Sequence, residues 1–299
     1  MRRIWSLLIL AACCMCLRIP VTAQCAAKQD HRSNKNSGVL VTELKIVGTS
    51  SLSSDELGAI ASDLTGSCFD QDSDEIAESI RDLFQNRGFF LSKVENVEIQ
   101  PVDALATPAP VTVKAEVTEG PRCKIGDIQF IDNRAFSQNQ LRRQFPVKKD
   151  DVFQRSKIAS GLEKMRDLYV SKGYLDLMMI PATNLSSGDG SVALTIQMLE
   201  GTQYHLGKLE IFAPTELADK LRAQWHMAEG AVFNRSYLLD YVRANHALLP
   251  ANFVPQDMQV VRDCPNAMVE VRMLVDPILA ASHPASREVE CEKTQPGSQ

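Results

Sequence analysis

Alternating apolar and polar residues occur three times along the chain, roughly 80 residues apart, and the alternation is strict in the first run, at 111–118. Such alternation is typical of a β-strand with one face buried and the other in water. The apolar positions of the three runs are Val111, Val113, Ala115 and Val117, then Val192, Leu194, Ile196 and Met198, then Val269, Val271, Met273 and Val275. Three half-buried strands are therefore predicted, and their even spacing indicates a repeated unit.

Helical patterns precede these strands. Ser53 with Glu56, and Ser137 with Gln140, form capping boxes that satisfy the free N–H groups of a first helical turn. Apolar residues then recur at helical spacing. These stripes are Leu57, Ile60, Ala61 and Leu64, then Ile76, Ile80, Leu83 and Phe84, and in the second copy Ile158, Leu162, Met165 and Tyr169. Each copy is thus predicted to contain two helices.

Short matches between copies support the repeat. The matching segments, about 80 to 85 residues apart, are Arg81–Phe89 with Arg166–Tyr174, Val152–Ser156 with Val232–Ser236, and Glu119-Gly120 with Glu200-Gly201. Gly88 and Gly173 follow the second helix, where a left-handed cap favours glycine. The unit reads strand–helix–helix–strand–strand, with opening strands at 43–48, 125–132 and 208–212. We expect an α+β fold in which two helices cover a three-stranded sheet.

The domain boundaries follow from these elements. We expect a signal peptide at 1–23, a linker at 24–38, three units at 39–121, 122–202 and 203–277, and a disordered tail at 278–299. The third unit is divergent, because Leu248–Asn252 stands where the other copies have glycine and an aromatic residue. Pro250, which lacks an N–H, is expected to end its second helix.

The N-terminal segment is typical of a secretory signal peptide. Arg2 and Arg3 precede a 4–17 apolar run that is too short for a membrane span of about 20 residues. Cleavage after Ala23 is the first interpretation. The residues before Cys13 also resemble a lipoprotein box, which would place a lipid on Cys13, and an uncleaved anchor is a third alternative. In each case we expect export to the periplasm, with a position at the outer membrane as the alternative.

The charge balance, 32 Lys and Arg against 37 Asp and Glu, argues against a nucleic-acid-binding protein, which needs a basic face. Export permits disulfides. The mature chain retains an odd number of cysteines, so one is unpaired or pairs between chains. These cysteines are Cys25, Cys68, Cys123, Cys264 and Cys291. Their spacing is compatible with the pairs Cys264–Cys291 and Cys68–Cys123 but does not determine the connectivity.

No pattern of catalytic, cofactor-binding or metal-binding residues is found. The histidines lack metal-site spacing, and no nucleophile elbow or phosphate loop occurs. Asp70, Asp72 and Asp74 begin like a calcium loop, but the required glycine and glutamate are replaced by Glu75 and Arg81. We therefore expect a protein that is not an enzyme and that uses no cofactor, metal or small-molecule substrate.

The repeat resembles the POTRA (polypeptide-transport-associated) domain of outer-membrane assembly and secretion proteins. The resemblance covers residues from about 39 to 277 and is clearest in the second copy. Its motifs are Ile128–Asn133, Val152-Phe153, Leu168-Tyr169, Lys172–Tyr174 and Leu199–Gly201. The family usually carries a C-terminal membrane barrel, but too few residues follow Pro277 for one, so none is expected in this chain.

The resemblance implies that the strand after the second helix, at 92–100, 175–183 and 254–261, is an exposed sheet edge. Unpaired backbone groups at an edge can take up an extended polypeptide as an added strand. The candidate binding residues are Val94, Asn96, Val97, Ile99, Leu175, Leu177, Met179, Val254, Met258 and Val260. The expected function is a periplasmic scaffold that binds polypeptide clients or an outer-membrane assembly machine. The alternative is an envelope lipoprotein or adaptor that tethers fixed partners through its helical faces.

Overall fold

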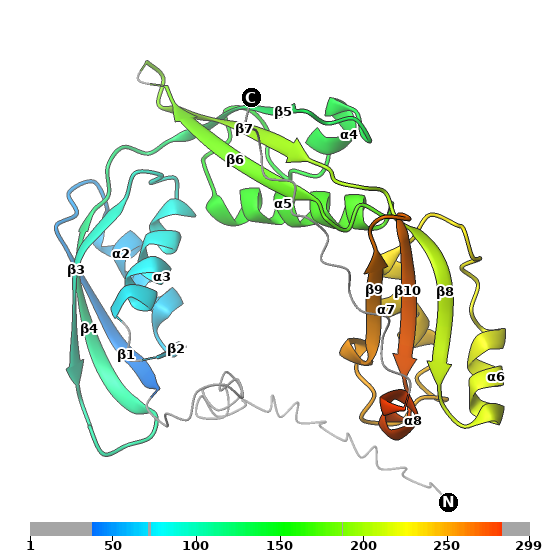
Figure 1. Ribbon diagram of the computed structural model, residues 1–299. Helices are drawn as coiled ribbons and strands as arrows, with labels where there is room; N and C mark the ends of the chain where they lie inside the picture. The colour runs from blue at the N-terminus through cyan, green and yellow to red at the C-terminus, as the bar shows by residue number, and fades with distance from the viewer. Residues whose placement is uncertain (1–37, 71–72, 187, 283–299) are drawn as a thin grey trace, which may run out of the picture. The chain divides into compact units, whose positions relative to one another are not determined.

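A computed structural model describes residues 38–70, 73–186 and 188–282 (Figure 1). The predicted signal peptide with Cys13, all but the last residue of the predicted linker, and most of the predicted tail lie outside these residues. The protein is of mixed α+β type, with three small sheets that each carry helices (Figure 1). The chain forms two compact units, with the boundary between Pro121 and Arg122. The first compact unit contains one sheet and the second contains two.

The first sheet has the strand order β2-β1-β4-β3. Strands β1 and β4 are parallel, and the other pairs are antiparallel. Its elements are β1 (Val39–Val47), α2 (Ser54–Leu64), β2 (Cys68–Phe69), α3 (Ser73–Gln85), β3 (Lys93–Pro101) and β4 (Ala109–Thr118). The expected three strands are joined by a fourth, because Cys68 and Phe69 pair with the start of β1. The matching positions of the other copies, Val152 and Val232, form only isolated bridges.

Strand β4 has one buried face, as the alternation in the sequence predicts. Every second residue from Val111 to Val117 is at most 1% exposed. These side chains pack against the apolar stripes of the two helices, represented by Ile60 in α2 and by Ile80 and Phe84 in α3. Burial of each such side chain contributes roughly 1.5–3 kcal/mol. The core of this unit therefore lies between the sheet and its two helices.

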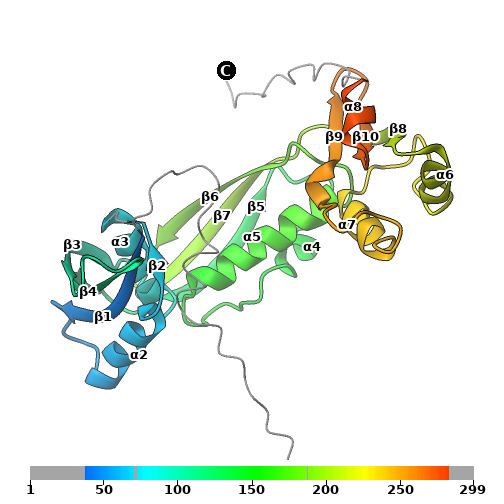
Figure 2. The ribbon, with the colours of Figure 1, turned by 90° about the horizontal axis from the view of Figure 1, so that it is seen from below.

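The second sheet has the order β5-β7-β6 and the third has the order β8-β10-β9. Strand β7 is parallel to β5 and antiparallel to β6. In the same way, β10 is parallel to β8 and antiparallel to β9. Helix α5 runs along one face of the second sheet (Figure 2). The elements of the second copy are β5 (Lys124–Ile131), α4 (Gln138–Arg142), α5 (Arg155–Val170), β6 (Met178–Leu185) and β7 (Ser191–Leu199). Those of the third copy are β8 (His205–Phe212), α6 (Thr215–Ala223), α7 (Arg235–Ala244), η1 (Pro255–Asp257), β9 (Met258–Asp263), β10 (Met268–Leu274) and α8 (Pro277–Ala281).

The predicted helix caps are present. Ser53 and Ser137 each form a complete capping box with the residue three positions later. Gly88 and Gly173 have φ values of 99° and 80°, in the left-handed region. At Gly173 space is also limiting, because an added Cβ would lie 2.5 Å from the carbonyl oxygen of Tyr204. Glycine is thus required there by conformation and by packing.

Two expectations about the third copy need correction. Helix α7 ends at Ala244, well before Pro250. The reason is Asn245, whose backbone N–H and side-chain amide both bond to the carbonyl of Tyr241 at the helix end. Residues 278–281 of the predicted tail belong to helix α8, which starts where the carboxylate of Asp276 accepts hydrogen bonds from Ile278 and Leu279.

The cysteines correct a further expectation. Cys68 and Cys264 are each in a disulfide, whereas the buried Cys123 is not. The pairing Cys68–Cys123 is therefore wrong. Cys25 and Cys291 lie outside the described residues. Among the described helices, none is both long and apolar enough to cross a membrane.

Candidate polypeptide-binding edges

Strands β3, β6 and β9 each lie at one edge of a sheet. Within the described residues, each pairs with a single neighbour, β4, β7 or β10. Backbone N–H and C=O groups on the outer side of such a strand are available to an added strand. Whether the candidate residues on them bind a polypeptide stays a prediction, and the three edges differ in how open they are.

The edge of the first sheet is interrupted. All four candidates there, Val94, Asn96, Val97 and Ile99, lie in β3. The pairing with β4 shifts by one residue between Val94 and Asn96, which marks a β-bulge. A bulge breaks the regular spacing of outward backbone groups and is a common protection of edges. The three apolar candidates pack partly against the first core.

The edge of the second sheet starts later than predicted and contains a proline. Met179 lies in β6, but Leu175 and Leu177 precede it. They belong to the turn after α5, in which the N–H of Leu175 bonds to the carbonyl of Gly173, and Leu177 is buried. Within β6, Pro181 offers no N–H, which is the second common protection of an edge.

The edge of the third sheet is uninterrupted. Met258 and Val260 lie in β9, which pairs with β10 without a register shift from Met258 to Asp263. The strand contains no proline. The third candidate, Val254, lies outside the strand, because Pro255 turns the chain into η1 and the carboxylate of Asp257 accepts the N–H of Val254. Of the three predicted edges, β9 is therefore the most suitable for strand addition.

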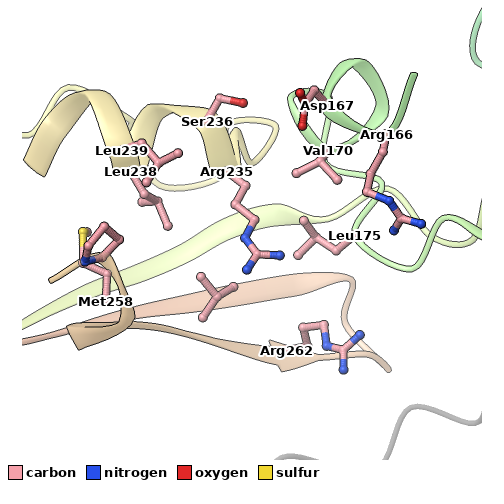
Figure 3. Close-up of a pocket in the computed structure, with 12 residues that line it drawn as sticks. Arg166, Asp167, Val170, Leu175, Arg235, Ser236, Leu238, Leu239, Met258 and Arg262 are labelled. Atoms are coloured by element: carbon pink, nitrogen blue, oxygen red, sulfur yellow. The ribbon is translucent and has the colours of Figure 1, made fainter. Parts of the chain in front are cut away.

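A groove of about 590 Å³ lies beside this edge, between α7, β9 and the end of α5. We call it the α7–β9 groove. Figure 3 shows its lining side chains, with Arg235 directed from α7 toward the β9 side. The apolar part of the lining comprises Val170, Leu175, Leu238, Leu239, Pro255, Met258 and Val260, and the polar part comprises Arg166, Asp167, Arg235, Ser236 and Arg262.

One end of the groove is fixed by an ion pair between the second and third copies. Arg262 of β9 donates to Asp176, in the turn before β6. The hydroxyl of Tyr204 donates to the same carboxylate at 2.7 Å. Burial, together with the hydrogen bond to Asp176, raises the pKa of Tyr204 to about 12, so it remains a donor at neutral pH. These contacts hold the turn after α5 against β9.

The first copy has a groove at the equivalent place, with the opposite charge. It measures about 660 Å³ and lies between α3 and β3. We call it the α3–β3 groove. Its charged lining residues are Asp74, Glu75, Glu78, Glu95, Arg81 and Lys93. Carboxylates outnumber cations here, whereas guanidinium groups outnumber the one carboxylate of the α7–β9 groove.

The repeated Glu-Gly motif has a structural role. Glu119 accepts the N–H groups of Ser50 and Ser51 at 2.9 and 2.8 Å. Glu200 accepts the N–H groups of Arg134 and Ala135. Each carboxylate thereby ties the loop after an opening strand to the end of the closing strand. These contacts explain why the motif recurs at the same place in the first and second copies.

Within the residues that the structure describes, no group of three or more His, Cys, Asp or Glu side chains could hold a metal ion. Four charged residues of this region have no signal as ligand-binding residues in the sequence. They are Arg166, Arg235, Arg262 and Asp176. Arg166 and Arg235 do occur in the repeated segments, but there they indicate only that the segments are repeated. The three arginines come from α5, α7 and β9 and meet only in the folded chain, so no single segment of the sequence predicts the groove.

The comparisons with known proteins agree with this fold. Residues 123–201 match the family model described as POTRA, surface antigen variable number repeat. This segment is the second copy, whose motifs carry the clearest resemblance. Residues 123–201 of the chain therefore form a POTRA domain.

Among the individual relatives is the outer membrane protein assembly factor BamA of Neisseria meningitidis serogroup B, 26% identical over 136 residues. The match covers 42% of this chain but 17% of that protein. A relative from Treponema pallidum is 24% identical over 210 residues, or 65% of this chain and 24% of its own. Each match thus spans a quarter or less of the relative.

Among solved structures, POTRA domains 3–5 of Haemophilus influenzae BamA superimpose with a TM-score of 0.57. The alignment has 20% sequence identity and covers 79% of this chain and 95% of that one. At this identity the likeness concerns the fold. The arrangement of sheets and helices in this chain is thus similar to that of three consecutive POTRA domains.

Proposed function

We propose that this chain is a non-enzymatic periplasmic scaffold that binds polypeptides by strand addition, in the assembly or transport of outer-membrane proteins. The similarity to an outer-membrane protein assembly factor supports a role in this process. The observation that carries the binding mode is β9, an edge strand without bulge or proline that borders a groove. An extended client would pair its backbone with β9 and place alternate side chains over the groove.

The expected affinity is low. A six-residue strand such as β9 offers about six backbone hydrogen bonds along its outer side, each contributing roughly 1 kcal/mol net. Ordering of the client reduces this sum. A dissociation constant in the tens of micromolar or weaker follows. Such weak, sequence-tolerant binding suits a client that must be released again.

The binding mode is tested with the full mature chain and two synthetic peptides. The first is a labelled ten-residue peptide of alternating Val and Thr, flanked by Gly and Ser for solubility. The second is the same peptide with N-methyl groups on alternate residues, which removes the N–H donors of one side. We expect fluorescence anisotropy to show binding of the first peptide and at least tenfold weaker binding of the second.

The position of the peptide is followed by hydrogen exchange. Bound peptide should slow exchange in β9 and leave β3 and β6 unchanged, since the bulge and Pro181 interrupt those edges. Equal affinity for the two peptides, with no protection of β9, would show that strand addition is the wrong mode. The periplasmic location is tested by the mass of the mature N-terminus, which starts at Gln24 after simple cleavage or at an acylated Cys13.

A further inference from the structure

We infer that the α7–β9 groove selects extended segments that carry acidic side chains. The inference rests on the proposed strand addition at β9 and adds the chemical class of the client. The groove as defined above combines an apolar lining with guanidinium groups from three elements, α5, α7 and β9. It is this combination, rather than the open edge alone, that distinguishes one client from another.

Two of the three arginines are available to a ligand. Arg166 and Arg235 are exposed, and neither forms an ion pair with another residue of the described chain. Arg262 differs, because it is engaged with Asp176. A guanidinium group without a carboxylate partner is suited to bind one through two parallel hydrogen bonds. The groove thus has two free positions for carboxylates.

The negative charge nearby is small. Asp167 is the single carboxylate of the lining, and it follows Arg166 directly on α5. Neighbouring residues of a helix point in different directions, so Asp167 is poorly placed to neutralise Arg166. Asp176 lies at the end of the groove but is shared by Arg262 and Tyr204. The field in the groove therefore remains positive.

The apolar lining determines the pattern of the client. Leu175 lies beside the guanidinium group of Arg235 (Figure 3), and Leu238 and Val260 belong to the same apolar lining. Side chains of an added strand alternate between the two faces of the sheet. Residues two positions apart would hence face the groove together, one on the apolar lining and one at a guanidinium group. The matching segment alternates, with apolar and acidic residues on one face.

The α3–β3 groove gives a comparison within the same chain. It has the equivalent position beside an edge strand, but carboxylates dominate its lining. An acidic segment would be repelled there. The selection for acidic clients should accordingly belong to the third copy and depend on its arginines, and not be a general property of the fold.

The test uses the full mature chain and two variants of the Val/Thr peptide described above. In one, two valines on the same face, four positions apart with one Val between them on that face, are replaced by Asp, and in the other by Asn. At about 50 mM salt we expect five- to tenfold tighter binding of the Asp peptide, because two exposed charge pairs contribute up to about 1 kcal/mol each. The advantage should shrink to less than twofold at about 0.5 M salt.

Chain variants locate the effect. The double variant Arg166→Gln, Arg235→Gln should bind the Asp and Asn peptides equally. The control Arg243→Gln, at the C-terminal end of α7 and paired with Asp240, should keep the preference. All three positions are exposed, so unchanged thermal unfolding is expected to confirm the fold.

Equal binding of the Asp and Asn peptides to the unmodified chain would overturn the inference. So would a preference that survives in the double variant. If the N-methylated peptide still binds weakly in that case, strand addition stands and only the selection for acid is wrong. If N-methylation has no effect either, the proposed function itself fails.

Discussion

Asp176 is the residue through which the contact between the second and third copies can be tested. It accepts hydrogen bonds from Tyr204 and Arg262. The side chains of Arg262 and Asp176 are 33% and 29% exposed, so water screens the ion pair and its contribution is about 0.5–1 kcal/mol. Tyr204 is 1% exposed, and loss of its carboxylate acceptor costs about 1–3 kcal/mol.

Two substitutions separate these contributions. Asp176→Asn removes the charge but keeps an oxygen for the Tyr204 hydroxyl, so we expect a loss of about 1 kcal/mol in the free energy of unfolding. Asp176→Ala removes both interactions, with an expected loss of about 2 kcal/mol. The lower part of the range applies because the sulfur of Cys264 lies 3.1 Å from the same hydroxyl.

The assay is urea unfolding followed by the fluorescence of Trp225. It is the one tryptophan outside the predicted signal peptide, and it packs against the core of the third copy. In the background Tyr204→Phe, where no hydroxyl is left unsatisfied, Asp176→Ala should cost about 1 kcal/mol less than in the unmodified chain. Equal losses in the Asn and Ala variants, or no difference between the two backgrounds, would refute this account of the contact.

Three further variants test other parts of the structure by urea unfolding. Gly173→Ala should cost about 2 kcal/mol more than Gly190→Ala, because both glycines have positive φ but an added Cβ is crowded only at Gly173. The carboxyl pKa of Glu119 lies below its ordinary value of 4.5, since backbone N–H bonds outweigh the effect of burial. The contribution of Glu119 to the free energy of unfolding is complete above pH 4.5 and is lost as pH falls through the lowered pKa. In the variant Glu119→Gln the free energy of unfolding should therefore depend less on pH in this acidic range. Arg272→Met should cost about 2–4 kcal/mol, because it leaves carboxylates in β8 and β10 without a buried cation.

Features that depend on neighbouring residues could be predicted from the sequence. The alternation at 111–118 predicts β4 and its buried face, and Ser53 with Glu56 predicts the start of α2. Both patterns are local, because a strand alternates with period two and a capping box spans about four residues. The resemblance of the second copy to POTRA domains is carried by equally short motifs.

Features that depend on distant contacts could not be predicted. Cys68 and Phe69 form an added strand by pairing with Leu40 and Val39 at the start of β1, from which they are separated by the whole of α2. Helix α7 ends early through the side chain of Asn245, although Pro250 is the stronger local signal. The charge of each groove arises where separate elements meet, so Arg166 and Arg235 acquire their significance only in three dimensions.

The unequal edges have a kinetic consequence. If polypeptides add to these sheets, the bulge in β3 and Pro181 in β6 leave β9 as the one uninterrupted edge among the three predicted edges. A long client would then not move along a row of equivalent sites. Its dwell time would be set by dissociation from a single short strand, and lengthening the client beyond that strand would speed its capture without slowing its escape.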